Sequence, residues 1–412
     1  MGRMSQLIVL GVLLAILPAA RPAPGEGRRP APPTRAERDF IDRHWRRPLL
    51  PQGDAPEHFS PAERSLLPAS CGGCHPAQLA DWSASLHSKS MGPGIAGQLV
   101  EMIRTEHASA RSCLACHAPL AEQAADIPGP ADSMPNPAFD PALRQQGLVC
   151  AGCHVRGHQR LGPPRRDGTT PDATARAAMP HGGFTPTSAF LRSEFCASCH
   201  QFTPNGFALN GKLLENTYEE WRASPAARRG LQCQGCHMPD RRHLWRGIHD
   251  PDMVRSGIRI TLRTGRGRDH SGTRVQATLT VANTGVGHHF PTYVTPRVLV
   301  RAEIFDASGR PIPGSAKERA IGRDVPVDLS RELADTRIPP GRGFTMTYAG
   351  RLDRPGLSLR VTVTVFPDHF YTRFFEALLG NGAGDGTAEI EAALEASRRS
   401  AFVLWSRDVP LT

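Results

Sequence analysis

The chain has 412 residues, a formal net charge of +10 and an aromatic content of 6%. On composition alone, so basic a chain suggests binding to nucleic acid or to another acidic surface. Its ten cysteines argue against that interpretation, because all of them fall into five copies of one short pattern with a different chemistry.

The N-terminus has the layout of a secretory signal. Arg3 precedes an apolar run from Leu7 to Leu17, which is too short to span a bilayer as a helix. No clean cleavage site follows, so we interpret residues 1–20 as a signal peptide or an uncleaved signal anchor. In either case we expect the body of the protein in the periplasm or elsewhere outside the cytoplasm, with membrane contact only if this segment is retained.

Residues 21–60 are rich in Pro, Arg and Ala, which predicts an extended arm rather than part of a core. The two histidines of this arm, His44 and His58, are therefore interpreted as surface or packing residues.

Five Cys-x-x-Cys-His motifs follow. This is the attachment pattern of c-type haem, in which two thiols bond to the porphyrin vinyl groups and the histidine becomes the proximal iron ligand. The motifs are Cys71, Cys74 and His75; Cys113, Cys116 and His117; Cys150, Cys153 and His154; Cys196, Cys199 and His200; and Cys233, Cys236 and His237. Zinc sites would leave one of the five cysteine pairs unmatched and would not require these histidines. The sequence therefore predicts five covalent c-type haems.

Five haems would change how the net charge and the core of the protein are interpreted. Their propionates offset most of the positive excess, so we expect no nucleic-acid partner. About one haem per 33 residues is too dense for an independent protein core, so residues 61–254 are expected to form a haem-packed, mostly irregular domain with few helices. The two helices predicted here are residues 76–86 and 217–221.

An internal repeat is visible in this domain. The second and third motifs begin 37 residues apart, at Cys113 and Cys150, and so do the fourth and fifth, at Cys196 and Cys233. The later motif of each pair follows a Gly-Leu step. This indicates either a duplicated two-haem unit or a geometric need that both sites share.

Each iron needs a sixth ligand or an open coordination position. Twelve histidines lie outside the motifs, and those in recognisable local settings are the predicted sixth ligands: His87, His181, His243, His249 and His288. The alternatives are His289 in place of His288, and methionine ligation by Met91, Met102 or Met179. His107 and His158 lie too near a proximal histidine to reach the opposite face of the same haem, although each could serve a neighbour. His270 and His369 are interpreted as surface or packing residues.

Beyond residue 255 the chain has no cysteine and its pattern changes to alternation. Apolar residues recur at every second position in residues 275–281, 298–304 and 359–365, separated by turn-forming residues. Residues 255–412 are therefore predicted to form an all-β, sandwich-like domain of about seven strands, with an exposed helix at 388–399 before a last strand at 402–406. His288 lies in a glycine-rich turn of this domain, so as an iron ligand it would fix the two domains together.

Residues 60–255 resemble multihaem c-type cytochromes of the superfamily that includes the tetrahaem cytochrome accepting electrons from hydroxylamine oxidoreductase. The resemblance depends on the order of the motifs and on their flanking residues, such as Trp82-x-x-Ser85-x-His87 behind the first motif and Asn216-Thr-Tyr-Glu-Glu-Trp221 before the fifth. It implies closely stacked, mostly bis-histidine haems and a role in electron transfer. The fifth haem and the β-rich C-terminal domain depart from it.

Two functions remain open. The favoured one is single-electron transfer with redox protein partners, either donor and acceptor cytochromes or a membrane quinol-linked cytochrome, and it assigns no catalytic residue. The alternative is a multihaem oxidoreductase acting on a small nitrogen or sulfur compound at one five-coordinate haem. Every motif ends in histidine and the spare histidines suffice for all five irons, which favours transfer over catalysis.

Overall fold

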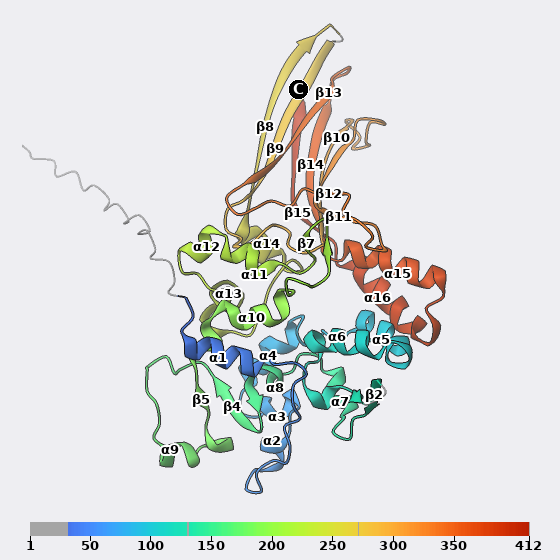
Figure 1. Ribbon diagram of the computed structural model, residues 1–412. Coiled ribbons are helices and arrows are strands. Elements are labelled where there is room, and N and C mark those ends of the chain that lie inside the picture. Colours follow the sequence, from blue (N-terminus) through green and yellow to red (C-terminus); the bar gives the residue numbers. More distant parts are fainter. Residues whose placement is uncertain (1–31, 130–131, 271, 412) are drawn as a thin grey trace, which may run out of the picture.

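The computed structural model describes residues 32–129, 132–270 and 272–411. The predicted signal segment, residues 1–20, lies outside the described residues. Within them the chain forms a helical part that carries the five motifs and a β-rich part that extends away from it (Figure 1). None of the helices in these ranges is long and apolar enough to cross a membrane.

The helical part is built from short segments. Its α-helices are α1 (Arg35–His44), α2 (Pro61–Arg64), α3 (Pro68–Gly72), α4 (Pro76–Ala84), α5 (Pro93–Thr105), α6 (His107–His117), α7 (Pro141–Gln145), α8 (Cys150–His154), α9 (Ala173–Ala177), α10 (Ser193–His200), α11 (Thr217–Arg222), α12 (Pro225–Arg228), α13 (Cys233–His237) and α14 (Pro251–Gly257). Small strands join them: β1 (Asp126–Gly129), β2 (Asp132–Pro135), β3 (Val155–Arg156), β4 (Gln159–Gly162), β5 (Thr185–Pro186), β6 (Ala208–Leu209) and β7 (Lys212–Leu213). Helices are thus more numerous than we expected, both at the motifs, as in α8 and α13, and between them, as in α5.

The expected arm also contains a helix. Helix α1 begins with a capping box between Thr34 and Glu37. Ile41 and Trp45 are buried, in one cluster with Phe190 and Phe195. Residues 35–45 are therefore packed into the molecule and do not form an extended segment.

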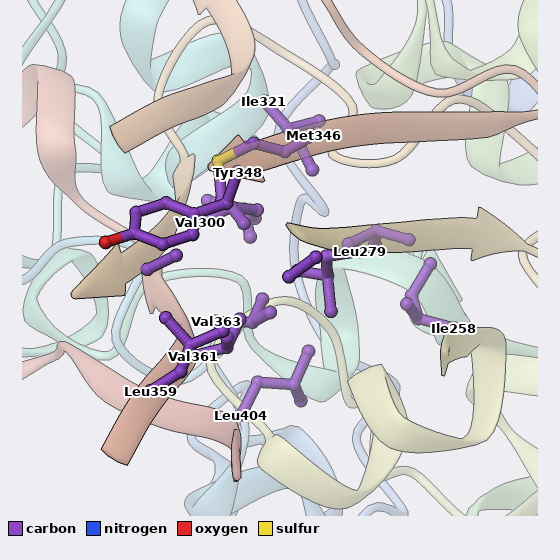
Figure 2. Packing of buried hydrophobic residues seen from close by; sticks show 14 of the residues in the cluster. Ile258, Leu279, Val300, Ile321, Met346, Tyr348, Leu359, Val361, Val363 and Leu404 are labelled. Atoms are coloured by element: carbon purple, nitrogen blue, oxygen red, sulfur yellow. The ribbon is translucent and has the colours of Figure 1, made fainter. Parts of the chain in front are cut away.

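The β-rich part consists of two antiparallel sheets. One has the strand order β12-β11-β10-β14-β15 and the other the order β13-β9-β8. The strands are β8 (Ile258–Asp269), β9 (Gly272–Asn283), β10 (Arg297–Phe305), β11 (Lys317–Asp324), β12 (Ala334–Asp335), β13 (Gly343–Arg351), β14 (Leu357–Phe366) and β15 (Phe402–Leu411). Alternate residues of both sheets, such as Leu279 and Val363, meet in one buried cluster (Figure 2). The apolar alternation of the sequence thus marks the inward faces of β9, β10 and β14.

Two helices between β14 and β15 attach the β-rich part to the helical part. Helices α15 (His369–Asn381) and α16 (Thr387–Arg399) pack on each other, and α16 packs on α5. A Cβ atom at Gly97 of α5 would lie 2.8 Å from the side chain of Ile390, so glycine permits this contact. Helix α16 buries Ile390 and Leu394, so it is not the exposed helix that we expected.

Candidate haem-binding site

Each motif occupies one turn of helix. In the first motif, the backbone N–H of His75 donates to the carbonyl of Cys71 at 2.9 Å. Helices α8 and α13 coincide with the third and fifth motifs, and α6 and α10 end at the histidines of the second and fourth. Residues three and four apart share one face of a helix. The two thiols and the histidine of each motif are therefore presented to the same side, as covalent attachment and proximal ligation of one haem require.

Four motif histidines have Nδ1 held by a fixed partner. In three of them Nδ1 approaches a backbone carbonyl oxygen: His117 with Ser90 at 2.7 Å, His154 with Leu161 at 2.8 Å and His237 with Arg246 at 2.6 Å. In His200 it lies 2.9 Å from the hydroxyl of Tyr293. A carbonyl oxygen only accepts, so Nδ1 carries the proton and Nε2 keeps a lone pair. This is how a metal-binding imidazole is oriented by its surroundings.

Three of these histidines face a second histidine at a characteristic separation. A metal–imidazole bond is about 2 Å long and the ring centre lies roughly 1 Å beyond the bound nitrogen, so two imidazoles across one metal have centres about 6 Å apart. The ring pairs are His200 with His87 at 6.3 Å, His237 with His288 at 6.3 Å and His154 with His243 at 6.1 Å. The structure thus brings three of the five predicted sixth ligands opposite a motif histidine, and the residues present fit c-type haem.

His87 is positioned by the segment that precedes the third motif. The carbonyl of His87 accepts from the backbone N–H of Leu148 at 3.1 Å, and the carbonyl of Leu148 accepts from the indole of Trp82 at 2.8 Å. A similar bond joins the indole of Trp221 to the carbonyl of Leu231, also at 2.8 Å, before the fifth motif. The repeat seen in the sequence therefore corresponds to a shared hydrogen-bonding arrangement.

His243 is anchored to helix α4. Its backbone N–H donates to Asp81 at 3.0 Å, and the guanidinium of Arg242 pairs with both oxygens of the same carboxylate at 2.6 and 2.7 Å. Asp81 is 6% exposed, so this two-point contact fixes the start of the loop that carries His243.

His288 comes from the loop between β9 and β10. The side chain of Asn283 donates to the carbonyl of His288 at 2.9 Å, and the His288 Nδ1 lies 2.8 Å from the carbonyl of His289. A Cβ atom at Gly287 would lie 3.2 Å from the side chain of Ala226 and 3.4 Å from that of Trp221. Glycine at this position therefore permits close packing of the loop on α11 and α12.

The rings of these ligand candidates are neutral. Burial lowers the pKa of His87 to about 3 and that of His288 to about 4, and it also lowers the pKa of His243. An unprotonated imidazole has the lone pair that an iron ligand needs. All three rings are therefore in the state required for metal binding at neutral pH.

Among the described residues, no second histidine ring faces His181 or His249, the other two predicted sixth ligands. The same holds for the motif histidines His75 and His117. The backbone N–H of His181 donates to Glu63, whose carbonyl accepts from Arg160, a residue close to Cys71. His181 therefore lies in the neighbourhood of the first motif.

His249 lies on the side of the second motif. Its Nε2 is 3.0 Å from both carboxylate oxygens of Asp368, and its Nδ1 is buried without a partner. Burial raises the pKa of Tyr371, as do the nearby Asp368 and Cys113. Tyr371 is thus near both Asp368 and the second motif, which places the Asp368–His249 pair in the neighbourhood of that motif.

The thiols of different motifs approach one another. Pairs close enough to interact are Cys71 with Cys150, Cys116 with Cys199, Cys196 with Cys233 and, at longer range, Cys153 with Cys196. The fourth motif therefore neighbours the second, third and fifth, and the first neighbours the third. Arg47, from the segment expected to be an arm, lies 3.5 Å from the sulfur of Cys116 and 3.1 Å from that of Cys199.

The histidines and methionines given less weight have other surroundings. Two of the histidines lie near carboxylates, His107 at 3.3 Å from Asp126 and His289 at 3.4 Å from Glu220. The ring of His158 is hydrogen-bonded to the carbonyl of Gly53, and that of His369 to the guanidinium of Arg297. Met91 and Met102 pack beside Leu99, and Met179 lies near Arg165. His44 is 3% exposed and neither of its ring nitrogens has a hydrogen-bond partner. Tyr293 and Arg47, which touch the motifs directly, were not identified from the sequence because no local pattern marks them.

Comparison with known proteins gives two informative similarities. The family model for cytochrome c554 and c-prime matches residues 70–154, which contain the first three motifs. A penta-heme cytochrome c552 from Thermochromatium tepidum is 16% identical, with a TM-score of 0.57 over 85% of this chain and 100% of that chain. A structural-genomics target is 19% identical over 27% of this chain and 74% of that chain, with a TM-score of only 0.18. No curated protein matches this chain. The family match and the shared fold together support a multihaem cytochrome c.

Proposed function

We propose that the protein transfers single electrons along five covalently bound c-type haems, mostly with bis-histidine ligation. One observation carries this proposal: three motif histidines face a second histidine at 6.1 to 6.3 Å between ring centres. When bound, the haem iron supplies the one-electron redox chemistry. A filled sixth position excludes exogenous ligands and lets iron change charge without changing ligands, which suits a carrier.

These contacts support the following ligand pairs. His87 serves the haem of the fourth motif, His243 that of the third and His288 that of the fifth. The surroundings described above support His181 for the first motif and His249 for the second. In this assignment the C-terminal β-rich part completes the haem array, since it contributes His288.

The thiol contacts support a branched order for the haems. The first leads to the third, the third to the fourth, and the fourth to both the second and the fifth. Cys74 and Cys236 are exposed whereas the other motif cysteines are partly buried. The first and fifth haems are therefore the places where electrons would be exchanged with redox protein partners, at a location outside the cytoplasm.

Mass spectrometry and electron paramagnetic resonance test this proposal. The mature chain is expected to carry five haem additions, the oxidised protein to show only low-spin signals, and carbon monoxide to leave the reduced spectrum unaltered. Three or fewer haems, in protein made with an intact haem-attachment system, would contradict the cofactor count.

One observation favours the second candidate, a multihaem oxidoreductase acting on a small nitrogen or sulfur compound. The Nε2 of His249 is held by Asp368, so this nitrogen has a partner already, and Tyr371 lies near the same motif. An acid–base pair beside an open iron position would suit proton-coupled reduction of a small substrate. A high-spin haem that binds nitrite or hydroxylamine would make this candidate the better one.

A further inference from the structure

The fourth motif differs from the second, third and fifth in the partner of its histidine. The Nδ1 atoms of His117, His154 and His237 face backbone carbonyl oxygens, whereas that of His200 faces the hydroxyl of Tyr293 at 2.9 Å. A carbonyl ends a hydrogen-bond chain because it only accepts. A phenol both accepts and donates, so it can pass polarisation onward.

Tyr293 is held in an unusual backbone conformation. Its φ of 61° lies in the left-handed region, which a bulky residue rarely adopts. Such strain persists only where the surroundings determine the conformation, and it is concentrated at functional positions. The residue lies in the same loop as His288, so this conformation brings a side chain of the β-rich part to the histidine of the fourth motif.

A chain of hydroxyl groups continues from Tyr293 to a carboxylate. The hydroxyl of Tyr293 interacts with that of Thr217, which lies 2.8 Å from the hydroxyl of Thr292. Thr292 donates to Glu220 at 3.1 Å. Because Thr292 donates its proton to the carboxylate, it accepts from Thr217, and the oxygen of Thr217 is then available as an acceptor for the hydroxyl of Tyr293. The oxygen of Tyr293 is then left to accept the Nδ1 proton of His200.

Glu220 is the anion at the end of this chain. Its side chain is 3% exposed and pairs with the guanidinium of Arg337 at 2.8 Å. Burial alone would raise its pKa, but His289 and Arg337 hold the pKa below its usual value. The other nearby carboxyl, Glu215, has its pKa raised to about 8 by burial, so it is neutral at neutral pH. The charge that orients the hydroxyl groups is therefore that of Glu220.

We propose that Tyr293 is a positioning residue that lowers the reduction potential of the haem at His200, through a hydroxyl relay ending at Glu220. A hydrogen bond from Nδ1 raises the basicity of a metal-bound imidazole, which favours the more highly charged, oxidised iron. This inference depends on the proposed haem ligation by His200. It gives the loop at residues 283–293 two roles, since the same loop supplies His288 to the fifth motif.

The variant Tyr293→Phe tests the proposal in the holoprotein by spectroelectrochemical titration. One of the five midpoint potentials is expected to rise, and the other four to stay at their wild-type values. Tyr348→Phe is the matched control, because its hydroxyl donates to the carbonyl of Ser315 inside the β-rich part. Five unchanged potentials in Tyr293→Phe, with an intact low-spin spectrum, would overturn the proposal.

The variant Thr217→Val tests the relay. It is expected to raise the same potential by a smaller amount, and the double variant to match Tyr293→Phe alone, because both changes interrupt one chain. Independent, additive shifts would overturn the relay. A wild-type protein whose fourth haem is absent or high spin would instead remove the proposed ligation itself, so the two failures are distinguishable.

Discussion

Four of the five motif histidines have a hydrogen-bond partner at Nδ1. Three of these four also face the ring of a second histidine. The local bond depends on neighbours such as Ser90 and Leu161, whereas the opposite ring comes from far along the chain, as with His87 and His200. The pentapeptide pattern therefore predicts the proximal ligands from local sequence alone, whereas the pairing of rings depends on the fold.

Replacement of His288 tests whether this residue is the sixth ligand of the haem at the fifth motif. The variant His288→Ala is expected to convert one haem of five to high spin, about one fifth of the total haem signal, because the sixth position loses its ligand. Electron paramagnetic resonance and carbon monoxide binding measure the change. His270→Ala, in an exposed turn, is the control. A wild-type spectrum in His288→Ala would refute the assignment.

Glu215 gives a pH dependence of stability. Burial raises its pKa from 4.5 to about 8, so between these values the folded protein holds a proton that the unfolded chain releases. The free energy of unfolding should then fall as the pH rises from 5 to 8, by roughly 1 kcal/mol per pH unit from this group. Urea denaturation of Glu215→Gln should lack this contribution. Glu219→Gln, at an exposed position, is the control, and parallel wild-type and Glu215→Gln profiles would contradict the prediction.

At the scale of elements, the best predicted parts are those with a local period or a covalent pattern. Alternation correctly located β9, β10 and β14, since one face of each strand is buried. Helix α15, in contrast, begins at His369 in a segment rich in aromatic residues that has no simple helical pattern. The burial of α16 could not be predicted from the local sequence either, because α16 packs against α5, which lies nearly 300 residues earlier in the chain.

Two glycines of the internal repeat have the same backbone conformation but different packing. Gly147 and Gly230 both have positive φ, at 68° and 83°. A Cβ atom at Gly147 would lie 2.5 Å from the hydroxyl of Ser90 and 3.0 Å from the carbonyl of His87, whereas at Gly230 it would meet nothing within 4 Å. The shared conformation explains the Gly-Leu step in both halves. The different surroundings predict that the two positions tolerate a larger side chain to different extents.

The pair of alanine variants should therefore differ in stability. Gly230→Ala is expected to cost about 1 to 2 kcal/mol from the left-handed backbone alone. Gly147→Ala should cost roughly 1 to 3 kcal/mol more, because the added methyl group displaces Ser90 and the segment of His87. Denaturation of the two holoproteins measures the difference, and Gly230→Ala serves as the control for backbone strain. Equal losses would show that the packing around Gly147 adapts freely.

At the scale of the whole molecule, the fourth motif holds the central position. Its thiols approach those of the second, third and fifth motifs, its histidine faces His87, which follows α4, and Tyr293 reaches it from the β-rich part. The fifth motif has the thiol of Cys196 as its neighbour and lies at an end of the array. A change of potential should therefore have different kinetic consequences at the two haems.

Methionine in the sixth position tests this difference. Methionine ligation raises a haem's reduction potential, so His87→Met would place an electron trap at the junction, whereas His288→Met would place one at an end. After a short pulse of reductant, His87→Met should add a phase several-fold slower to the redistribution of electrons among the haems. His288→Met is the matched control, since electrons moving among the first four haems need not pass the fifth. Resonance spectra of both variants would establish that methionine is bound. Equal kinetics in two correctly ligated variants would show that the haems do not branch at the fourth motif, and that electrons follow another order through the array.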